Sequence, residues 1–239
     1  MIKPEIIFED DSFYILDKPS GWIVNSAVTT KEQPVIQSWL KDNYEYEISK
    51  NDELRSGIVH RIDKETSGLL TVAKTETAFR ELQRQFKERE VSKTYITLVH
   101  GEVSPEKGVI EVPVGRLPWR RDRFGVVAGG RDSKTSYEVI DIYKKSNDLY
   151  SLVECFPKTG RTHQIRIHMK HINHAIVGDY FYAGRKTSKK DREWCPRLFL
   201  HAKKISFTHP VLKKQVEFEL NLPSDLKSVL KKLQLEKKI

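Results

Sequence analysis

The sequence predicts an α+β fold in which helices pack on a mixed, largely antiparallel sheet. Apolar runs that alternate or are continuous indicate more strands than helices along the chain. Most expected strands are neighbours in the sequence, with single helices inserted between them, whereas a doubly wound fold alternates strand and helix throughout. The composition changes abruptly nowhere, so we expect one domain over residues 1–239.

The first half of the chain predicts strands around two helices. The continuous apolar run Gly68–Lys74 is typical of a buried strand. Thr75 can cap the helix that follows, in which Phe79, Leu82 and Phe86 share one face. A shorter helix is expected at residues 34–40, with a proline in its first turn. The strands are expected at residues 5–8, 12–17, 68–74 and 91–100.

The second half combines strands with a basic loop and two helices. Residues 113–133 show no clear period, and a loop of this length in a compact domain is usually functional or disordered. Apolar residues at helical spacing predict a helix over residues 162–176, and Ser224 is expected to cap a last helix that includes Leu233. Antiparallel pairs are expected for residues 135–143 with 149–156, and for residues 205–208 with 215–222.

The charge of the chain favours a polyanionic partner. It has 42 basic and 33 acidic residues, a net charge of +9, and the basic residues gather at residues 116–134 and 185–192. On net charge alone, a generic basic protein is an equal alternative. A third basic group, near the C-terminus, is typical of a solvated helix face.

Cysteine content and hydropathy point to the cytoplasm. The two cysteines, Cys155 and Cys195, lie far apart and in no motif, which excludes a disulfide framework and fits a reducing compartment. No stretch approaches eighteen apolar residues, and the N-terminus lacks an apolar signal region. We therefore expect no contact with a membrane.

A first polar cluster precedes the buried strand. In residues 57–74, GIVHRIDKETSGLLTVAK, the side chains of residues 60–63 lie at the mouth of the predicted strand. A carboxylate held there by a rigid scaffold suits nucleophilic or general-base chemistry, which makes Asp63 a candidate catalytic residue. The alternative is a turn in which Asp63 only caps backbone amides.

A second cluster, PKTGRTHQIRIH at residues 157–168, joins glycine to a predicted helix. Backbone amides after Gly160 would suit an anion, and Arg161, His163, Arg166 and His168 add donors. The alternative is an amphipathic helix with a basic face. A metal site is not expected, because histidines three residues apart on a helix do not converge on one point.

Tyr95 belongs to a third motif, Ser92-Lys93-Thr94-Tyr95, in the middle of an expected strand. A tyrosine in this position is more often part of a core than catalytic. Its role depends on which face of the sheet it occupies, and both readings stay open at this point.

Together these motifs resemble the RluA-type pseudouridine synthase family. The first resembles the family's H-R-L-D-x-x-T-S-G-L-L sequence, with Ile62 in place of leucine, the second its T-G-R-x-H-Q-[IL]-R-[IV]-H, and the third its K-x-Y strand. Smaller matches occur at residues 18–21, 81–86, 178–179 and 197–201. The order and spacing fit from about residue 5 to residue 223, closest to members that lack an N-terminal RNA-binding domain.

The resemblance implies the pseudouridine synthase fold with a central catalytic cleft, and the isomerisation of uridine to pseudouridine in RNA. The glycosidic bond breaks, the uracil turns, and a carbon–carbon bond forms at carbon 5. No atom is gained or lost, so no cofactor, redox partner or energy source is implied. The chain contains no nucleotide-binding glycine loop, in agreement with this reaction.

The resemblance also assigns roles to individual residues. Asp63 matches the catalytic aspartate, whether it attacks the sugar, attacks the ring or removes a proton. Arg166 matches the arginine that pairs with this aspartate, and such a neighbour lowers a carboxyl pKa. Tyr95 matches the tyrosine that stacks on uracil and is a candidate base in the final deprotonation. Ile167 is expected to wall the other side of the ring.

The implied substrate is a uridine in a loop of rRNA or tRNA. A stacked base must be flipped out to react, and Arg61 is expected to fill the space it leaves. Arg161 and His163 are expected to bind the substrate, and residues 116–134 and 185–192 to contact phosphates. We expect a monomer in the cytoplasm with no protein partner.

Two other functions are alternatives. A catalytically silent RNA-binding protein or RNA chaperone would keep the fold and the basic surface, although the intact set Asp63, Tyr95 and Arg166 argues against loss of catalysis. A hydrolase that depends on Asp63 would normally need a second carboxylate or a metal nearby, and nothing marks Glu65 as such a partner.

Overall fold

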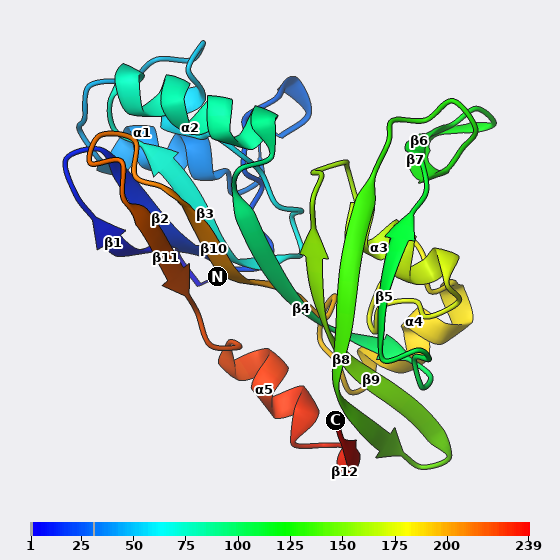
Figure 1. The fold of residues 1–239 in the computed structure, drawn as a ribbon. Coiled ribbons are helices and arrows are strands. Elements are labelled where there is room, and N and C mark those ends of the chain that lie inside the picture. Colours follow the sequence, from blue (N-terminus) through cyan, green and yellow to red (C-terminus); the bar gives the residue numbers. More distant parts are fainter. Residues whose placement is uncertain (1, 31) are drawn as a thin grey trace. The chain divides into compact units, whose positions relative to one another are not determined.

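The computed structural model describes residues 2–30 and 32–239, and not the side chains of Thr29 and Arg121 (Figure 1). The chain forms two compact units, each with its own hydrophobic core. Unit 1 comprises Met1–Ser92 and Ala202–Leu220, and unit 2 comprises Lys93–His201 and Asn221–Ile239. Within the described residues, we find no helix with the length and apolar character that a bilayer crossing requires.

Unit 1 is a sheet with two helices and two short 3-10 turns. The strand order is β1-β2-β3-β10, and β11 pairs with β10. The pairs β1 with β2, β2 with β3, and β10 with β11 are all antiparallel. The elements are β1 (Glu5–Glu9), β2 (Phe13–Lys18), η1 (Val28–Thr30), α1 (Ile36–Asn43), η2 (Arg55–Gly57), β3 (Ser67–Ala73), α2 (Glu76–Glu88), β10 (Leu200–Thr208) and β11 (Gln215–Glu219).

The core of unit 1 explains why the strand β3 and the start of α2 could be predicted from the sequence. Every residue of β3 is buried, as its continuous apolar run predicts. The Thr75 side chain accepts a hydrogen bond from the amide of Ala78 at 3.2 Å, which confirms the predicted cap of α2. Phe79 and Leu82 on α2 pack with Phe13 and Leu69 in this core. The buried strand β3 therefore gives rigid support to the residues that precede it in the sequence.

Unit 2 contains the strand order β4-β9-β8-β12, with β5 paired to β8 and a separate ribbon of β6 and β7. The long pair of β8 and β9 confirms the hairpin predicted at residues 135–156. Leu98, Val153, Met169 and Phe199 lie at the centre of its core. The elements are β4 (Ser92–His100), β5 (Lys107–Glu111), β6 (Val114–Leu117), β7 (Arg120–Val126), β8 (Lys134–Lys145), β9 (Asp148–Pro157), α3 (Gln164–His171), α4 (Arg185–Arg192), α5 (Ser224–Leu230) and β12 (Gln234–Lys238).

The prediction of a loop over residues 113–133 is wrong for most of this segment. Residues 114–126 form the antiparallel hairpin of β6 and β7, with Arg116 opposite Phe124. The hairpin carries exposed charged residues rather than one buried face, so its sequence shows no alternation. The segment after the hairpin returns to its first strand. There, the amide of Val114 donates to the carbonyl of Arg131 at 3.0 Å, and the amide of Arg131 donates to the carbonyl of Val114 at 2.9 Å.

The second half also differs from prediction in its helices. Helix α3 ends at His171 instead of Ile176, because Asn173 adopts a left-handed conformation with φ of 68°. Ser224 is the first residue of α5 and makes no capping bond, and α5 ends at Leu230, before Leu233. Strands β5 and β12 were not predicted, and the basic insert at residues 185–192 is helix α4.

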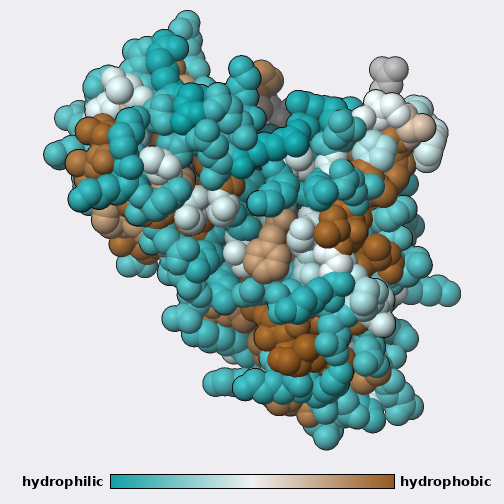
Figure 2. Space-filling model, viewed as in Figure 1, coloured by the Kyte–Doolittle hydropathy of each residue, from teal (hydrophilic) through white to brown (hydrophobic). Residues whose placement is uncertain are grey.

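The surface is mainly polar. On the face drawn in Figure 2, hydrophilic residues cover most of the area and hydrophobic residues show as separate patches. All five basic side chains of α4 are exposed, whereas Ser188 and Asp191 of the same helix are buried. The helix therefore docks through two small polar residues and leaves its positive charges in solvent.

Gly68, at the start of β3, allows a test of this packing. Its φ is +112°, and an added Cβ would lie 2.3 Å from the carbonyl oxygen of Ala202. Gly68→Ala is expected to lower the free energy of unfolding by about 3 kcal/mol or more, since backbone strain alone costs roughly 1–3 kcal/mol. Urea denaturation followed by circular dichroism measures this loss.

Gly129 is the matched control, because its φ is +76° and nothing lies within 4 Å of an added Cβ. Gly129→Ala should cost only the left-handed strain of roughly 1–2 kcal/mol. Equal losses in the two variants would contradict the close approach of Gly68 to Ala202.

Candidate active site

Asp63 opens a tight turn that leads into β3. The amide of Thr66 donates to the carbonyl of Asp63 at 3.1 Å, with Lys64 and Glu65 at the corners. The Asp63 side chain is half-buried, and Thr66 is 1% exposed. The turn is therefore anchored at one end by the fully buried strand that follows it.

The segment Lys18–Gly21 braces this turn from the other side. The amide of Gly21 and the Lys18 Nζ donate to the carbonyl of Lys64, at 2.8 and 3.3 Å. Ser20 Oγ donates to the carbonyl of Glu65 at 2.8 Å. Lys18 is fully buried, and its ammonium also donates to the carbonyls of Pro19 and Trp22. Both corner carbonyls of the turn are thus bonded, which limits the movement of Asp63.

His60 contacts the scaffold, whereas Arg61 is exposed to solvent. His60 Nε2 accepts the amide of Thr71 at 2.9 Å, and its ring stacks on Phe86 at 4.7 Å. Arg61 is exposed, and the next side chain, Ile62, is 5% exposed. His60 therefore holds the segment to the scaffold while Arg61 is available to a partner.

In unit 2, the Gln164 side chain organises the start of α3. Its Oε1 accepts from Thr159 Oγ1 at 2.7 Å and from the amide of Arg161 at 3.0 Å. Its Nε2 donates to the carbonyl of Lys134 and to Thr135 Oγ1. The anion site predicted after Gly160 is therefore partly wrong. The helix starts at Gln164, and the Arg161 amide is already bonded to Gln164.

Arg166 forms a buried bidentate ion pair with Asp179. Its Nε and Nη2 donate to the two oxygens of Asp179 at 2.8 and 2.9 Å. The side chains are 3% and 0% exposed. Asp179 Oδ1 also accepts the amides of Phe181 and Tyr182, at 2.9 and 3.1 Å. This carboxylate fixes both the guanidinium of Arg166 and the turn that follows Asp179.

Aromatic rings surround this ion pair. The Arg166 guanidinium lies 5.4 Å from the ring centre of Phe181 and 5.0 Å from that of Tyr182. The Tyr182 hydroxyl and His163 Nδ1 are 2.9 Å apart, within hydrogen-bond distance. His163 has a left-handed backbone with φ of 57° just before α3. His163 and Arg166, predicted as neighbours from the motif, are thus held by one aromatic turn.

The other predicted residues of unit 2 take separate places. Tyr95 is half-buried on β4, opposite Cys155 of β9, and packs against the core. Ile167 is 3% exposed on α3. Arg161 is half-buried and its Nε donates to the carbonyl of Asp132 at 3.0 Å. Tyr95 is thus neither fully buried nor fully exposed, and its stacking role stays a prediction.

Arg61 and Asp63 belong to unit 1, whereas Tyr95, Arg161, His163, Arg166 and Ile167 belong to unit 2. Three residues that position them were not singled out from the sequence, namely Lys18, Gln164 and Asp179. All three lie within matched motifs, so the motif matches were the available signal, although no periodicity marked these side chains.

His168 and His174 both have structural partners. His168 is fully buried, and its Nε2 lies 2.9 Å from Ser133 Oγ, which in turn donates to the carbonyl of Val112. His174 Nδ1 lies 2.8 Å from the carbonyl of His100. Across residues 2–30 and 32–239, no group of three His, Cys, Asp or Glu side chains is placed to hold a metal ion.

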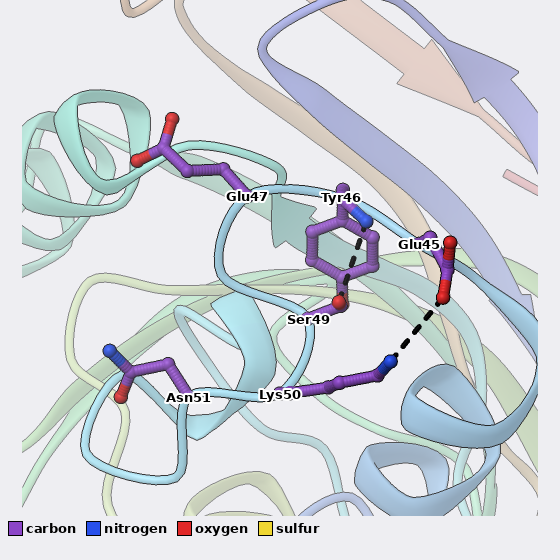
Figure 3. Close-up of a pocket in the computed structure, with 6 residues that line it drawn as sticks. All are labelled: Glu45, Tyr46, Glu47, Ser49, Lys50 and Asn51. Atoms are coloured by element: carbon purple, nitrogen blue, oxygen red, sulfur yellow. Dashed lines mark hydrogen bonds and ion pairs between the residues drawn. The ribbon is translucent and has the colours of Figure 1, made fainter.

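A pocket of about 460 Å³ lies in unit 1, away from the predicted residues in sequence (Figure 3). Figure 3 shows Lys50 paired with Glu45 at 3.3 Å, and the Tyr46 amide directed at Ser49 Oγ at 3.4 Å. None of the predicted site residues lines it. Its lining residues are Glu45, Tyr46, Glu47, Ser49, Lys50 and Asn51.

Comparisons with known proteins identify close relatives. A family model described as RNA pseudouridylate synthase matches residues 12–171. Ribosomal large subunit pseudouridine synthase D of Nitrosomonas europaea is 37% identical over 96% of this chain and 65% of its own length. Its namesake in Zymomonas mobilis is 36% identical, over 98% and 74%. The chain therefore spans less than two thirds of the first relative and about three quarters of the second.

The fold also matches solved structures. Human RNA Pseudouridylate Synthase Domain Containing 1 aligns with a TM-score of 0.77 and 24% identity, over 99% of this chain and 90% of that one. Human RNA Pseudouridylate Synthase Domain Containing 4 gives 0.72 and 22%, over 98% and 94%. These likenesses confirm the predicted α+β pseudouridine synthase fold.

His168 predicts a pH dependence of stability. Burial, with a smaller contribution from His171, lowers the pKa of His168 from 6.5 to about 4. The unfolded chain takes up this proton near pH 6.5 and the folded protein near pH 4, so stability falls as the pH falls between these values. The difference corresponds to about 3 kcal/mol. Urea denaturation at pH 7, 5.5 and 4 measures it.

His168→Gln should flatten this pH dependence, because the glutamine amide does not titrate. His171→Gln is the control, since His171 is exposed on the same helix and makes only the smaller contribution, so most of the dependence should remain. A His168→Gln variant that loses stability with pH as steeply as the wild type would contradict the role given to His168.

Proposed function

The chain belongs to the RNA pseudouridylate synthase family, and we propose that it isomerises uridine to pseudouridine in structured RNA. The observation that carries this proposal is the match of the family model over residues 12–171, which include the braced turn of Asp63 and the Arg166 helix. Relatives named for the large ribosomal subunit favour rRNA as the substrate, and tRNA is the alternative.

The reaction is an internal transfer that balances by itself. The bond from ribose C1′ to uracil N1 breaks, and a bond from C1′ to C5 forms. The proton on C5 leaves and N1 gains one, so no atom is gained or lost overall. What the protein must supply is an ionised carboxylate, a fixed orientation for the uracil, and a group that accepts the proton of C5.

Asp63 is the catalytic carboxylate in this proposal. Its turn is bonded to Gly21, Ser20 and Lys18, so the backbone that carries it is held in advance of substrate binding. Arg166 is the partner cation, and its contact with Asp179 keeps the guanidinium in one orientation. Tyr95 is the stacking residue and a candidate proton acceptor.

The remaining contacts bind the nucleotide and its RNA. Arg61, exposed beside Asp63, fills the space left by a flipped base. Arg161 and His163 bind the substrate, and Ile167 walls the uracil. Exposed arginines on the β6–β7 hairpin and five exposed basic residues of α4 contact phosphates. The side chain of Arg121, also in the hairpin, lies outside the described part of the chain.

We further propose that both units serve one catalytic domain, because the predicted catalytic residues come from each of them. The protein would act as a monomer in the cytoplasm, where rRNA and tRNA are available. No cofactor enters the reaction as proposed.

Asp63→Asn is expected to abolish tritium release from RNA labelled at carbon 5 of uridine. Asparagine keeps the size of the side chain but cannot supply the carboxylate, so the rate should fall by roughly three orders of magnitude or more. Purified rRNA and tRNA, assayed separately, would also identify the substrate class.

Glu65→Gln is the matched control, because Glu65 is the carboxylate two residues away in the same turn. It should release tritium at the wild-type rate. The proposal fails if folded wild-type protein releases no tritium from either RNA, or if Asp63→Asn releases it unchanged. Retained RNA binding without release would instead favour the silent RNA chaperone.

The exposed charges of α4 predict a salt dependence of RNA binding. Lys189→Gln with Lys190→Gln should reduce the slope of log K against log salt by about 1 to 2, because up to two phosphate contacts are lost. Fluorescence anisotropy with a labelled RNA at several salt concentrations measures the slope.

The control removes two exposed lysines near the C-terminus, Lys227→Gln with Lys231→Gln, and changes the net charge equally. It should leave the slope unchanged. Equal slopes for the two double variants would show that α4 makes no special contact with phosphates.

A further inference from the structure

Phe181 contacts guanidinium groups from two different elements of unit 2. Its ring centre lies 5.4 Å from the guanidinium of Arg166 on α3 and 5.5 Å from that of Arg123 on β7. Both distances are within the range of a cation–π interaction. Phe181 is 39% exposed, so burial in the core does not explain its position.

Arg123 holds the backbone of Phe181 as well as its ring. Its Nη1 donates to the carbonyl of Phe181 at 3.1 Å. Arg123 belongs to the β6–β7 hairpin, whose turn carries Trp119 with 77% of its surface exposed. A two-stranded ribbon has little stability of its own, so its position depends on anchors such as this one. The hairpin also packs against α3, the helix of Arg166.

The backbone on the other side of Phe181 is fixed by the partner of Arg166. Asp179 Oδ1 accepts the amide of Phe181 at 2.9 Å and Arg166 Nη2 at 2.9 Å. Arg123, Phe181, Asp179 and Arg166 therefore form an uninterrupted series of contacts. The series starts on the basic hairpin and ends on the guanidinium that the proposed function assigns to catalysis.

We propose that Phe181 is a positioning residue that links the RNA-binding hairpin to Arg166. RNA that binds the hairpin fixes the position of the Arg123 side chain, and Arg123 in turn fixes the position of Phe181. The ring and backbone of Phe181 then fix the orientation of the Arg166 guanidinium. This inference rests on the proposed function, because it requires Arg166 to serve the reaction. Phe181 itself needs no contact with the uridine.

The test compares Phe181→Leu with Phe181→Tyr. Leucine keeps an apolar side chain but removes the π face, so kcat should fall about tenfold, the size expected when two cation–π contacts are lost. KM for the RNA should change less than twofold, because the phosphate contacts remain. Tyrosine keeps the ring face and should restore kcat to within twofold of the wild type.

Tyr180→Leu is the matched control. Tyr180 is the neighbouring exposed aromatic, and its ring meets that of Phe181 edge-on at 5.9 Å. Among the described side chains, no guanidinium lies over the Tyr180 ring, so the variant removes a ring contact without removing a cation–π contact. This variant should keep the wild-type kcat. The inference is overturned if Phe181→Leu retains full kcat, if Phe181→Tyr is impaired as much as Phe181→Leu, or if Tyr180→Leu loses as much.

A second measurement does not depend on activity. The Nε–H of Arg166, bonded to Asp179 at 2.8 Å, should give a slowly exchanging signal in ¹⁵N NMR spectra of the free protein. Phe181→Leu and Arg123→Gln should both shift or broaden it, and Tyr180→Leu should not. An unchanged signal in the first two variants overturns the link.

The two measurements separate the inference from the proposed function. If the wild type forms no pseudouridine in any RNA, the proposed function fails, and the NMR comparison still decides whether Phe181 positions Arg166. If the wild type is active and Phe181→Leu matches it in both kcat and the Arg166 signal, only the inference fails.

Discussion

The buried ion pair of Arg166 and Asp179 is the constraint on which the predicted site in unit 2 depends. Burying two charges is costly, and the attraction between them repays this cost only with close geometry and further hydrogen bonds. Asp179 meets that condition, because its oxygens accept from Arg166 twice and from the amides of Phe181 and Tyr182. The pair therefore contributes orientation more than stability. Through Gly178, whose amide donates to the buried Asp191 of α4, the same turn also anchors the basic helix.

Unit 1 uses a buried charge in a comparable way. The ammonium of Lys18 is enclosed by the carbonyls of Pro19, Trp22 and Lys64, and the last of these belongs to the turn of Asp63. The bond from Lys18 to the Lys64 carbonyl adds to the bond from the Gly21 amide, so both hold the turn of Asp63. In both units, a buried charged residue that is given no step in the proposed reaction holds a functional residue in place. The proposed catalytic groups are thus prepared by their surroundings before RNA arrives.

Sequence reasoning succeeded where burial imposes a period or a motif imposes an order. The buried strand β3 and the β8–β9 hairpin follow from apolar patterns. The family follows from the motifs, and the family model confirms it over residues 12–171. The roles of Asp63 and Arg166 stay predictions. Sequence reasoning failed where the structure depends on the backbone conformation of a single residue, or where a segment has little buried surface. Apolar spacing continued past the end of α3, but the left-handed Asn173 stops the helix. In the β6–β7 hairpin, only Val114 is buried among the described side chains, and exposed and half-buried residues follow each other without a clear alternation. Asp179 was visible only as half of a two-residue match.

The central claim is that this chain makes pseudouridine in cellular RNA through Asp63. The most direct test maps pseudouridine across total RNA from cells with the protein, without it, and with only the Asp63→Asn variant. We predict that at least one position in rRNA or tRNA loses its pseudouridine when the protein is absent. That position should regain it with the wild-type chain and not with the variant. Identical maps in all three cells, with the protein expressed and folded, would contradict the account.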